Sequence, residues 1–203
     1  MEKEKYVEDL SEIRKIMSRS ARFISLSGLS GVSTGIIALA GAWLVHQLVF
    51  RNHDYLVYEA AQIDAVNLSK LLLIALGTLL LSVFSALWFT DRKSRKENQH
   101  VWDNQAKRLL INLLIPLTTG GILCLIFLFK GFVGFLPALT LIFYGLALVN
   151  GSHYTLSHIR YLGIAEIVLG LFAFLFIDQS LYLWMLGFGV IQMIYGLMIQ
   201  RKG

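Results

Sequence analysis

Residues 68–90 read LSKLLLIALGTLLLSVFSALWFT, an apolar run that contains one charged residue, Lys70. A helix needs about 20 mainly apolar residues to cross about 30 Å of hydrocarbon, so this stretch is long enough to span a membrane. Five further stretches of this kind fill most of the chain: 24–50, 109–129, 131–149, 159–177 and 180–199. The sequence therefore predicts an all-α polytopic membrane protein with six transmembrane helices.

The composition also indicates lipid as the main solvent. Of the 203 residues, 56% are hydrophobic and 15% are charged, and the mean hydropathy is +0.65. Soluble domains carry about 25% charged residues. The formal net charge of +5 does not indicate nucleic-acid binding, because the basic residues are not gathered on one surface with interleaved aromatic residues. We expect the lipid bilayer to be the main partner.

The basic residues instead indicate the orientation in the membrane. With six crossings, Arg51, Lys70 and Lys130 are the ones among the 18 lysines and arginines that fall on the side opposite the chain ends. Cytoplasmic segments are enriched in lysine and arginine. The charge pattern therefore predicts that both termini lie in the cytoplasm. We expect the membrane to be the inner membrane of a bacterium.

The N-terminal segment is polar and divides the chain into two parts. Within residues 6–22, apolar positions recur at helical spacing, acidic residues come first and basic residues last, which suits the helix dipole. We expect residues 1–22 to form a cytoplasmic amphipathic helix on the membrane surface, with a protein-binding helix as the alternative. Residues 23–203 then form the transmembrane domain.

Short connections predict how the spans pair. Spans three and four meet around Lys130-Gly131, and spans five and six around Asp178-Gln179, so each pair must form an antiparallel hairpin. With both termini inside, the chain becomes three consecutive in-out-in hairpins, which implies parallel repeats about an axis along the membrane normal. The similarity of residues 142–146, IFYGL, to residues 193–197, MIYGL, gives this repeat limited support.

Span one carries small residues where another helix could approach closely. Ser27, Gly31 and Gly35 follow one another at four-residue spacing. Small residues in this register allow tight helix packing in membranes. The pattern favours packing within the chain, and a homodimer or a larger membrane complex through the same residues is the alternative.

Glu166 is the acidic residue that lies well inside a predicted span, where a carboxyl group is costly and is by default a candidate functional site. Counted from the turn at 178–179, Gln192 lies at nearly the same depth, so we expect the two side chains to hydrogen-bond. The same count from the turn at 130–131 places Thr118 and Tyr144 in this layer. The sequence thus predicts one buried polar site of four residues.

Three interpretations of Glu166 remain open at this point. It is a protonated structural residue bonded to Gln192, a proton or cation site in a transporter or sensor, or a catalytic acid or base. A catalytic role would require a nucleophile or a metal nearby, and none is evident in the sequence. The first interpretation is favoured over the second, and the second over the third.

No cofactor or metal site is expected. Five ionisable residues gather around the predicted outer loop, but their spacing fits no compact ligand pattern of the kind that zinc uses: His46, His53, Asp54, Glu59 and Asp64. His100 and Asp103 share one helix face in the loop between spans two and three, but they lack further partners for hydrolysis or phosphotransfer.

Two resemblances add expectations about function. The stretch from Tyr154 to Gly196, with Arg160 to Glu166 reading RYLGIAE and Leu186 to Val190 reading LGFGV, resembles a group of uncharacterised small membrane proteins from Bacteroidetes. Hairpins two and three loosely resemble the HdeD-like acid-resistance membrane proteins, which have six helices. The first resemblance implies no known activity, and the second implies a role in acid or envelope stress.

The sequence favours a non-enzymatic membrane protein, either structural, stress-related or partner-binding. A transporter or channel for a small solute, proton or ion that uses Glu166 is the second hypothesis, and an intramembrane enzyme is the third. The first predicts a filled bundle interior. The second predicts a water-accessible cavity that reaches Glu166.

Overall fold

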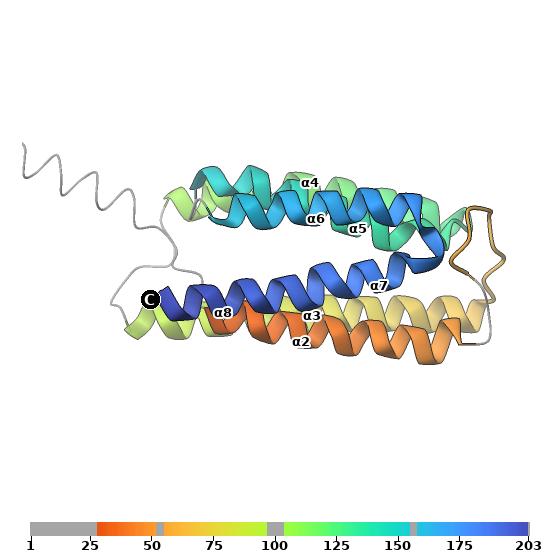
Figure 1. Ribbon diagram of the computed structural model, residues 1–203, viewed down its shortest axis with the longest axis horizontal. Helices are drawn as coiled ribbons and strands as arrows, with labels where there is room; N and C mark the ends of the chain where they lie inside the picture. The colour runs from red at the N-terminus through yellow and green to blue at the C-terminus, as the bar shows by residue number, and fades with distance from the viewer. Residues whose placement is uncertain (1–27, 52–54, 97–103, 155–157, 203) are drawn as a thin grey trace, which may run out of the picture.

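A computed structural model of the chain describes residues 28–51, 55–96, 104–154 and 158–202 (Figure 1). These ranges are almost entirely helical and contain no strand. The expected amphipathic helix over residues 1–22 lies outside the described residues. So do five residues singled out from the sequence: Ser27, His53, Asp54, His100 and Asp103.

Six helices are long and apolar enough to cross a membrane, which confirms the predicted fold class. The first is α2 (Gly28–Val45), which continues as the π-helical segment η1 (His46–Phe50). The next four are α3 (Ala65–Lys96), α4 (Asn104–Phe129), α5 (Leu136–Gly151) and α6 (His158–Leu175). The sixth is built from α7 (Ser180–Trp184), the π-helical segment η5 (Met185–Ile191) and α8 (Gln192–Lys202).

Three short 3-10 turns join these helices: η2 (Val133–Phe135), η3 (Ser152–Tyr154) and η4 (Ile177–Gln179). The turn before η2 uses Gly131, whose φ of 84° is a conformation that other residues rarely adopt. Such tight connections leave each pair of helices antiparallel, as the sequence predicts. The start of α2 and the end of α8 accordingly lie at the same end of the bundle (Figure 1).

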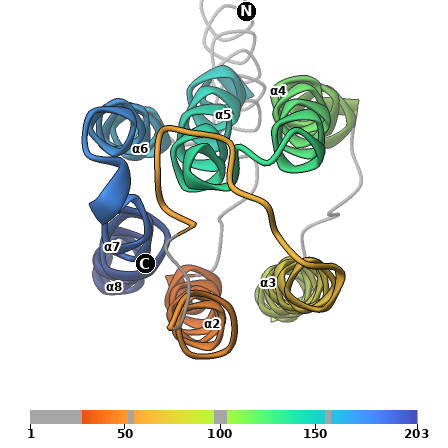
Figure 2. The same ribbon diagram turned by 90° about the vertical axis from the view of Figure 1, so that its right-hand side faces the viewer.

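Viewed along the bundle, the three hairpins form an incomplete ring (Figure 2). Each hairpin joins two neighbouring spans: α2 with α3, α4 with α5, and α6 with α7. The last span then leaves α6, and its α8 segment packs along α2. The ring therefore has two closed seams between hairpins, one between α5 and α6 and one between α8 and α2.

Glycines form both closed seams. A Cβ on Gly145 would lie 2.5 Å from the carbonyl oxygen of Gly163, and a Cβ on Gly196 would lie 2.6 Å from that of Gly28. Real Cβ atoms do not approach other atoms this closely, so each seam requires glycine. Gly145 and Gly196 are the glycines of the two similar segments, 142–146 and 193–197. The similarity therefore marks equivalent packing positions at the two seams.

The third seam, between α3 and α4, stays open. These helices are not among the pairs that pack together within the described ranges. Only 6% of the apolar window of α3 and 11% of that of α4 is buried, against 39% for α2 and for α5. Two glycines on these helices, Gly77 and Gly121, have no atom within 4 Å of the point where a Cβ would lie. The rest of the described chain therefore leaves most of the apolar surface of both helices uncovered.

The segment 55–64 crosses one end of the bundle and ties both halves together (Figure 2). The Tyr58 hydroxyl donates to the Leu175 carbonyl at 2.6 Å, and the Ala61 N–H donates to the Gly131 carbonyl at 3.0 Å. The Asp64 carboxylate accepts the N–H of Asn67 at 3.2 Å, which caps the start of α3. These bonds fix the segment to α6, to the α4–α5 turn and to α3.

Candidate functional site

Glu166 lies on the face of α6 that packs into the α5–α6 seam. Gly163 and Gly170, three residues before it and four after, are buried with it on the same face. Gly170 packs against Ile142 and the Ala138 carbonyl of α5. This spacing places Glu166 toward protein and away from lipid, and its side chain is 0% exposed.

The space for the Glu166 carboxyl group comes from Gly187 in η5. A Cβ at position 187 would collide with the Oε2 atom of Glu166, and the side chain of Leu141 also lies close to this glycine. The last span therefore reaches Glu166 through a glycine in its π-helical segment. Such segments recur at functional sites in other proteins.

Next to this carboxyl group, Tyr144 is held in place by contacts with the sixth span. Its hydroxyl accepts a hydrogen bond from Nε2 of Gln192 at 3.1 Å. Its ring packs on Phe188 at a centroid distance of 4.7 Å, and Phe188 in turn packs on Trp184 at 4.8 Å. Tyr144 also lies close enough to Glu166 and Tyr195 for electrostatic interaction. The four polar residues Glu166, Tyr144, Gln192 and Tyr195 form what we call the polar layer.

The hydrogen bond expected between Glu166 and Gln192 is not formed. Both carboxyl oxygens of Glu166 lack a hydrogen-bond partner, and so does Oε1 of Gln192. A residue count from the turn compares depth alone, whereas the π-helical segment between the turn and Gln192 changes the direction in which that residue points. Gln192 therefore bonds to Tyr144, and Gly187 occupies the position beside Glu166.

The structure does not bring Thr118 into the polar layer. Its side chain is exposed on α4, and its hydroxyl donates to the Leu114 carbonyl of the same helix at 2.7 Å. The residue count again compares depth alone, and the α4 face that carries Thr118 points away from α5 and α6. Bonding to the backbone of its own helix satisfies a threonine in lipid without a partner from another helix.

Tyr195 belongs to the polar layer although the sequence analysis did not place it there. Its hydroxyl is buried without a hydrogen-bond partner. It follows Gln192 by three residues, which puts the two side chains on one helix face. This spacing, together with the similarity between segments 142–146 and 193–197, is the signal that would have found it.

Among the described residues, the buried side-chain atoms that lack a hydrogen-bond partner all belong to this layer. They are the two carboxyl oxygens of Glu166, Oε1 of Gln192 and the hydroxyl of Tyr195. Buried polar atoms are nearly always paired, and each unpaired one costs about 1–3 kcal/mol. A cluster of four such atoms, all oxygen, therefore calls for an explanation beyond packing.

The small residues of span one that the structure describes pack within the chain. Gly31 lies against the backbone of Gly196, and Gly35 lies against Met193 and the Gly189 carbonyl. Both contacts belong to the α8–α2 seam. The last span thus covers the surface that the sequence analysis offered as the alternative site for a homodimer.

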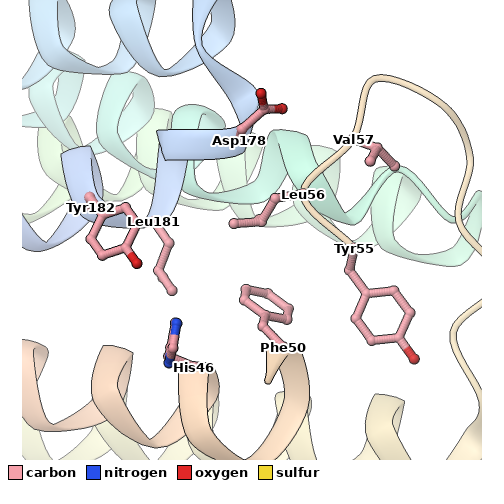
Figure 3. Close-up of a pocket in the computed structure, with 8 residues that line it drawn as sticks. All are labelled: His46, Phe50, Tyr55, Leu56, Val57, Asp178, Leu181 and Tyr182. Atoms are coloured by element: carbon pink, nitrogen blue, oxygen red, sulfur yellow. The ribbon is translucent and has the colours of Figure 1, made fainter. Parts of the chain in front are cut away.

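A second candidate site is a pocket of about 360 Å³ at the end of the bundle that carries the segment 55–64 (Figure 3). It lies between η1, the start of this segment and the start of the sixth span. Its lining consists of His46, Phe50, Tyr55, Leu56, Val57, Asp178, Leu181 and Tyr182. Figure 3 shows the His46 ring directed toward Leu181 and Tyr182.

The described residues were also compared with the clusters of histidine, cysteine and acidic side chains that hold metals such as zinc. Within the ranges that the structure describes, no group of three or more histidine, cysteine, aspartate and glutamate side chains comes close enough to hold a metal ion. Of the five ionisable residues considered from the sequence, His46 lines the pocket and Asp64 caps α3. Glu59 is exposed.

Among the described acidic residues outside the spans, Asp64 is the one whose surroundings clearly change its pKa. Desolvation raises its pKa, but hydrogen bonds from the Asn67 backbone and from the Tyr55 hydroxyl outweigh this effect and lower the pKa below its ordinary value of 3.8. The carboxylate form is therefore the one that holds the start of α3. Its role is structural.

Comparison of the chain with protein families, with curated proteins and with solved structures finds no match. The geometry of the polar layer and of the pocket therefore has to carry any statement about function.

Proposed function

We propose that this protein binds a proton or a small monovalent cation at Glu166 and uses that binding to transport the ion across a bacterial cytoplasmic membrane. One observation carries the proposal: the carboxyl group of Glu166 is fully buried in a membrane-spanning helix, and neither of its oxygens has a hydrogen-bond partner. Buried polar atoms are nearly always paired, so a bound proton or cation would account for these oxygens.

The chemistry of the polar layer suits a hard cation. Its unpaired atoms are all oxygens, contributed by a carboxyl group, an amide and a phenol. Oxygen ligands favour protons and hard cations over the softer metals that bind histidine and cysteine. A buried charge in lipid is tolerated when it is paired, so a cation beside Glu166 would remove the cost of the carboxylate.

The purely structural interpretation of Glu166 has less support. It requires the carboxyl group to hydrogen-bond to Gln192, and the amide of Gln192 is instead bonded to Tyr144. An enzymatic role has less support again, because the described residues bring no group of histidine, cysteine, aspartate and glutamate side chains to Glu166 that could hold a catalytic metal. The water-accessible cavity that the transport hypothesis predicts is not seen in this conformation, because Glu166 is fully buried and does not line the described pocket. The proposal therefore assigns this conformation to the closed state of the cation site.

The proposal also includes the orientation of the protein in the membrane. Arg51 and Lys130 lie at the end of the bundle that carries the segment 55–64, whereas Arg92, Lys93, Arg95 and Arg201 lie at the other end. By the positive-inside rule the second end faces the cytoplasm, together with both termini. A role in acid or envelope stress, implied by the resemblance to the acid-resistance proteins, is compatible with a proton site.

The test is a flux assay in proteoliposomes. Proton, sodium and potassium gradients are applied in turn, and flux is read with ion-sensitive dyes inside the vesicles. We expect flux of one of these ions with the parent and loss of at least tenfold in Glu166→Gln, which keeps the shape but not the charge. The matched control is Glu59→Gln, an exposed residue in segment 55–64.

Three results would refute this function. The first is an absence of flux for all three ions with folded, correctly inserted parent protein. The second is flux that Glu166→Gln leaves unchanged, which would remove Glu166 from the mechanism. Equal loss in Glu166→Gln and Glu59→Gln would also count against it, because it would point to a general charge effect.

The open seam favours a second candidate function, a non-enzymatic partner-binding role with a second copy of the chain as partner. Two seams of the ring close through glycines, whereas α3 and α4 stay apart and carry Gly77 and Gly121 with open space beside them. We expect a dimer in lipid nanodiscs by native mass spectrometry, and its loss in Gly77→Phe. A monomeric parent at all concentrations would contradict this candidate.

A further inference from the structure

A shallow groove of about 320 Å³ lies on one face of α3, towards the end of the bundle at which α2 begins (Figure 1). Four residues from two adjacent turns of this helix line it: Phe84, Ser85, Trp88 and Phe89. The rest of the described chain leaves much of this lining uncovered, because Phe84 is 64% exposed and Trp88 is 57% exposed. The groove shares no lining residue with the polar layer or with the pocket of Figure 3.

The groove offers a ligand mainly apolar surface. The Phe84 and Trp88 rings lie 5.9 Å apart, and Phe89 adds a third aromatic side chain. Ser85 is the lining residue with a hydroxyl group, and this group already shares a hydrogen bond of 2.6 Å with the Ser33 hydroxyl of α2. A ligand therefore gains most by burying carbon here, which suits an alkyl chain.

Arg92 continues the same face of α3 beyond the groove. It follows Ser85 by seven residues and Trp88 by four, which places these three residues on one side of the helix. The Arg92 side chain is exposed, and a chain of this length can lie along apolar surface while its charge stays at the level of the lipid headgroups. The neighbouring Asp91 carboxylate accepts a hydrogen bond from Nε of Arg95 at 2.8 Å, so its charge is already offset.

The charge at this end of the groove selects the headgroup. Residues 91–96 read DRKSRK, with four basic residues and one acidic residue. A guanidinium group binds phosphate through two parallel hydrogen bonds, so Arg92 suits a phosphate that carries an alkyl chain. A zwitterionic headgroup would bring an ammonium group to the same basic residues, and repulsion would offset part of the attraction. The combination therefore favours an anionic lipid.

We propose that this face of α3 binds an anionic phospholipid, with an acyl chain in the groove and the headgroup phosphate on Arg92. The lipid would cover part of the apolar surface that α3, which packs mainly on α2, leaves exposed. The proposal does not depend on the cation site at Glu166.

The experiment measures lipid binding to the full chain by native mass spectrometry. The probes are dioleoylphosphatidylglycerol and dioleoylphosphatidylcholine, which share their acyl chains and differ in net headgroup charge. We expect the anionic lipid to bind about fivefold more tightly, the gain expected from one basic residue at the membrane surface. Arg92→Gln should remove this preference, and Arg92→Lys, which keeps the charge, should retain most of it. Trp88→Ala should weaken binding of both lipids.

The matched control is Arg201→Gln, which removes an exposed positive charge from α8 at the same end of the bundle. It should bind phosphatidylglycerol like the parent. Equal losses in Arg201→Gln and Arg92→Gln would overturn the proposal, because total charge alone would explain them. So would equal binding of the two lipids by the parent protein.

A photoreactive phosphatidylglycerol with a diazirine in its acyl chain then locates the bound lipid in nanodiscs. Cross-links to residues 84–89 in the parent, and their loss in Arg92→Gln, support the proposal. Cross-links confined to other residues would overturn it, because another part of the chain or a second copy would then cover the groove.

A competition arm separates a lipid from a soluble phosphate compound. Glycerophosphoglycerol carries the same headgroup without acyl chains and should not displace the lipid at millimolar concentration. Displacement would overturn the assignment to a lipid, because the headgroup alone would then bind as well. Because none of these readouts involves ion flux, failure of this proposal is distinguishable from failure of the function proposed for Glu166.

Discussion

The two sides of the helix ring are built in opposite ways. On one side, α5 packs on α6 and α8 packs on α2 through glycines, with backbone atoms in direct contact. On the other side, α3 and α4 do not pack on each other and expose most of their apolar surface. The polar layer belongs to the closed side. The costly buried polar atoms thus lie where glycines bring the helix backbones closest together.

The largest effect is expected where a side chain is forced into a closed seam. Gly145→Val would push a branched side chain against the Gly163 carbonyl, and we expect it to lower the free energy of unfolding by about 3 kcal/mol, the upper end of what overpacking costs. The measurement is unfolding in mixed detergent micelles, followed by circular dichroism.

Its control is Gly121→Val on α4, where nothing lies within 4 Å of the added carbon. We expect a change of less than about 0.5 kcal/mol there, as for other surface substitutions. Similar losses in the free energy of unfolding at positions 145 and 121 would refute the difference between the two sides, because the open side would then be packed as tightly as the closed one.

A second substitution removes the unpaired carboxyl group itself. Glu166→Leu replaces a buried group without a hydrogen-bond partner by an apolar side chain, so we expect the free energy of unfolding to rise by about 1–2 kcal/mol. The same unfolding assay measures it without added cation, and Glu59→Leu should leave stability unchanged. A loss of stability in Glu166→Leu would mean that the carboxyl group has partners after all.

A smaller effect is expected for the hydrogen bond between Gln192 and Tyr144. Hydrogen bonds between membrane helices contribute about 0.6 kcal/mol on average, so Tyr144→Phe should cost about that much. A double-mutant cycle with Gln192→Leu isolates the pair. Thr118→Val on the open side, where the hydroxyl bonds to its own helix, serves as the control and should show no coupling to Gln192→Leu.

The smallest effect concerns Asp64, at the end of the bundle that joins both sides. Because its pKa is lowered in the folded protein, the stabilisation is fully present above 3.8 and is lost as the pH falls through the lower folded value. Hydrogen exchange of the Asn67 amide should therefore be constant from neutral pH down to about 4 and faster below, after correction for intrinsic rates. Asp64→Asn should abolish this pH dependence.

Depth along a helix could be predicted from the sequence, whereas direction around the helix could not. Span lengths and short turns were enough to predict six helices in three hairpins, because hydrophobic length and chain connectivity determine both. Gln192 and Thr118 were matched to Glu166 by depth alone, and the π-helical segment η5 altered the direction of the first.

The open seam and the pocket were also beyond the sequence. Nothing in the composition of residues 68–90 distinguishes a helix that packs on one neighbour from a helix packed on two. The pocket depends on a loop crossing the bundle end and on hydrogen bonds such as that from Tyr58 to Leu175, which join residues far apart in the chain. Such contacts follow from the tertiary arrangement and leave no local pattern.

The most direct test of the account is water-edited solid-state NMR of the protein in lipid bilayers. It compares how fast magnetisation from water reaches the side-chain carboxyl carbons of Glu166 and Glu59, which are fully buried and exposed, respectively. The account predicts transfer to Glu166 that is at least tenfold slower than to Glu59. Equally fast transfer to both would contradict it. Glu166 would then be hydrated, and water would pair the oxygens that the proposal assigns to a bound proton or cation.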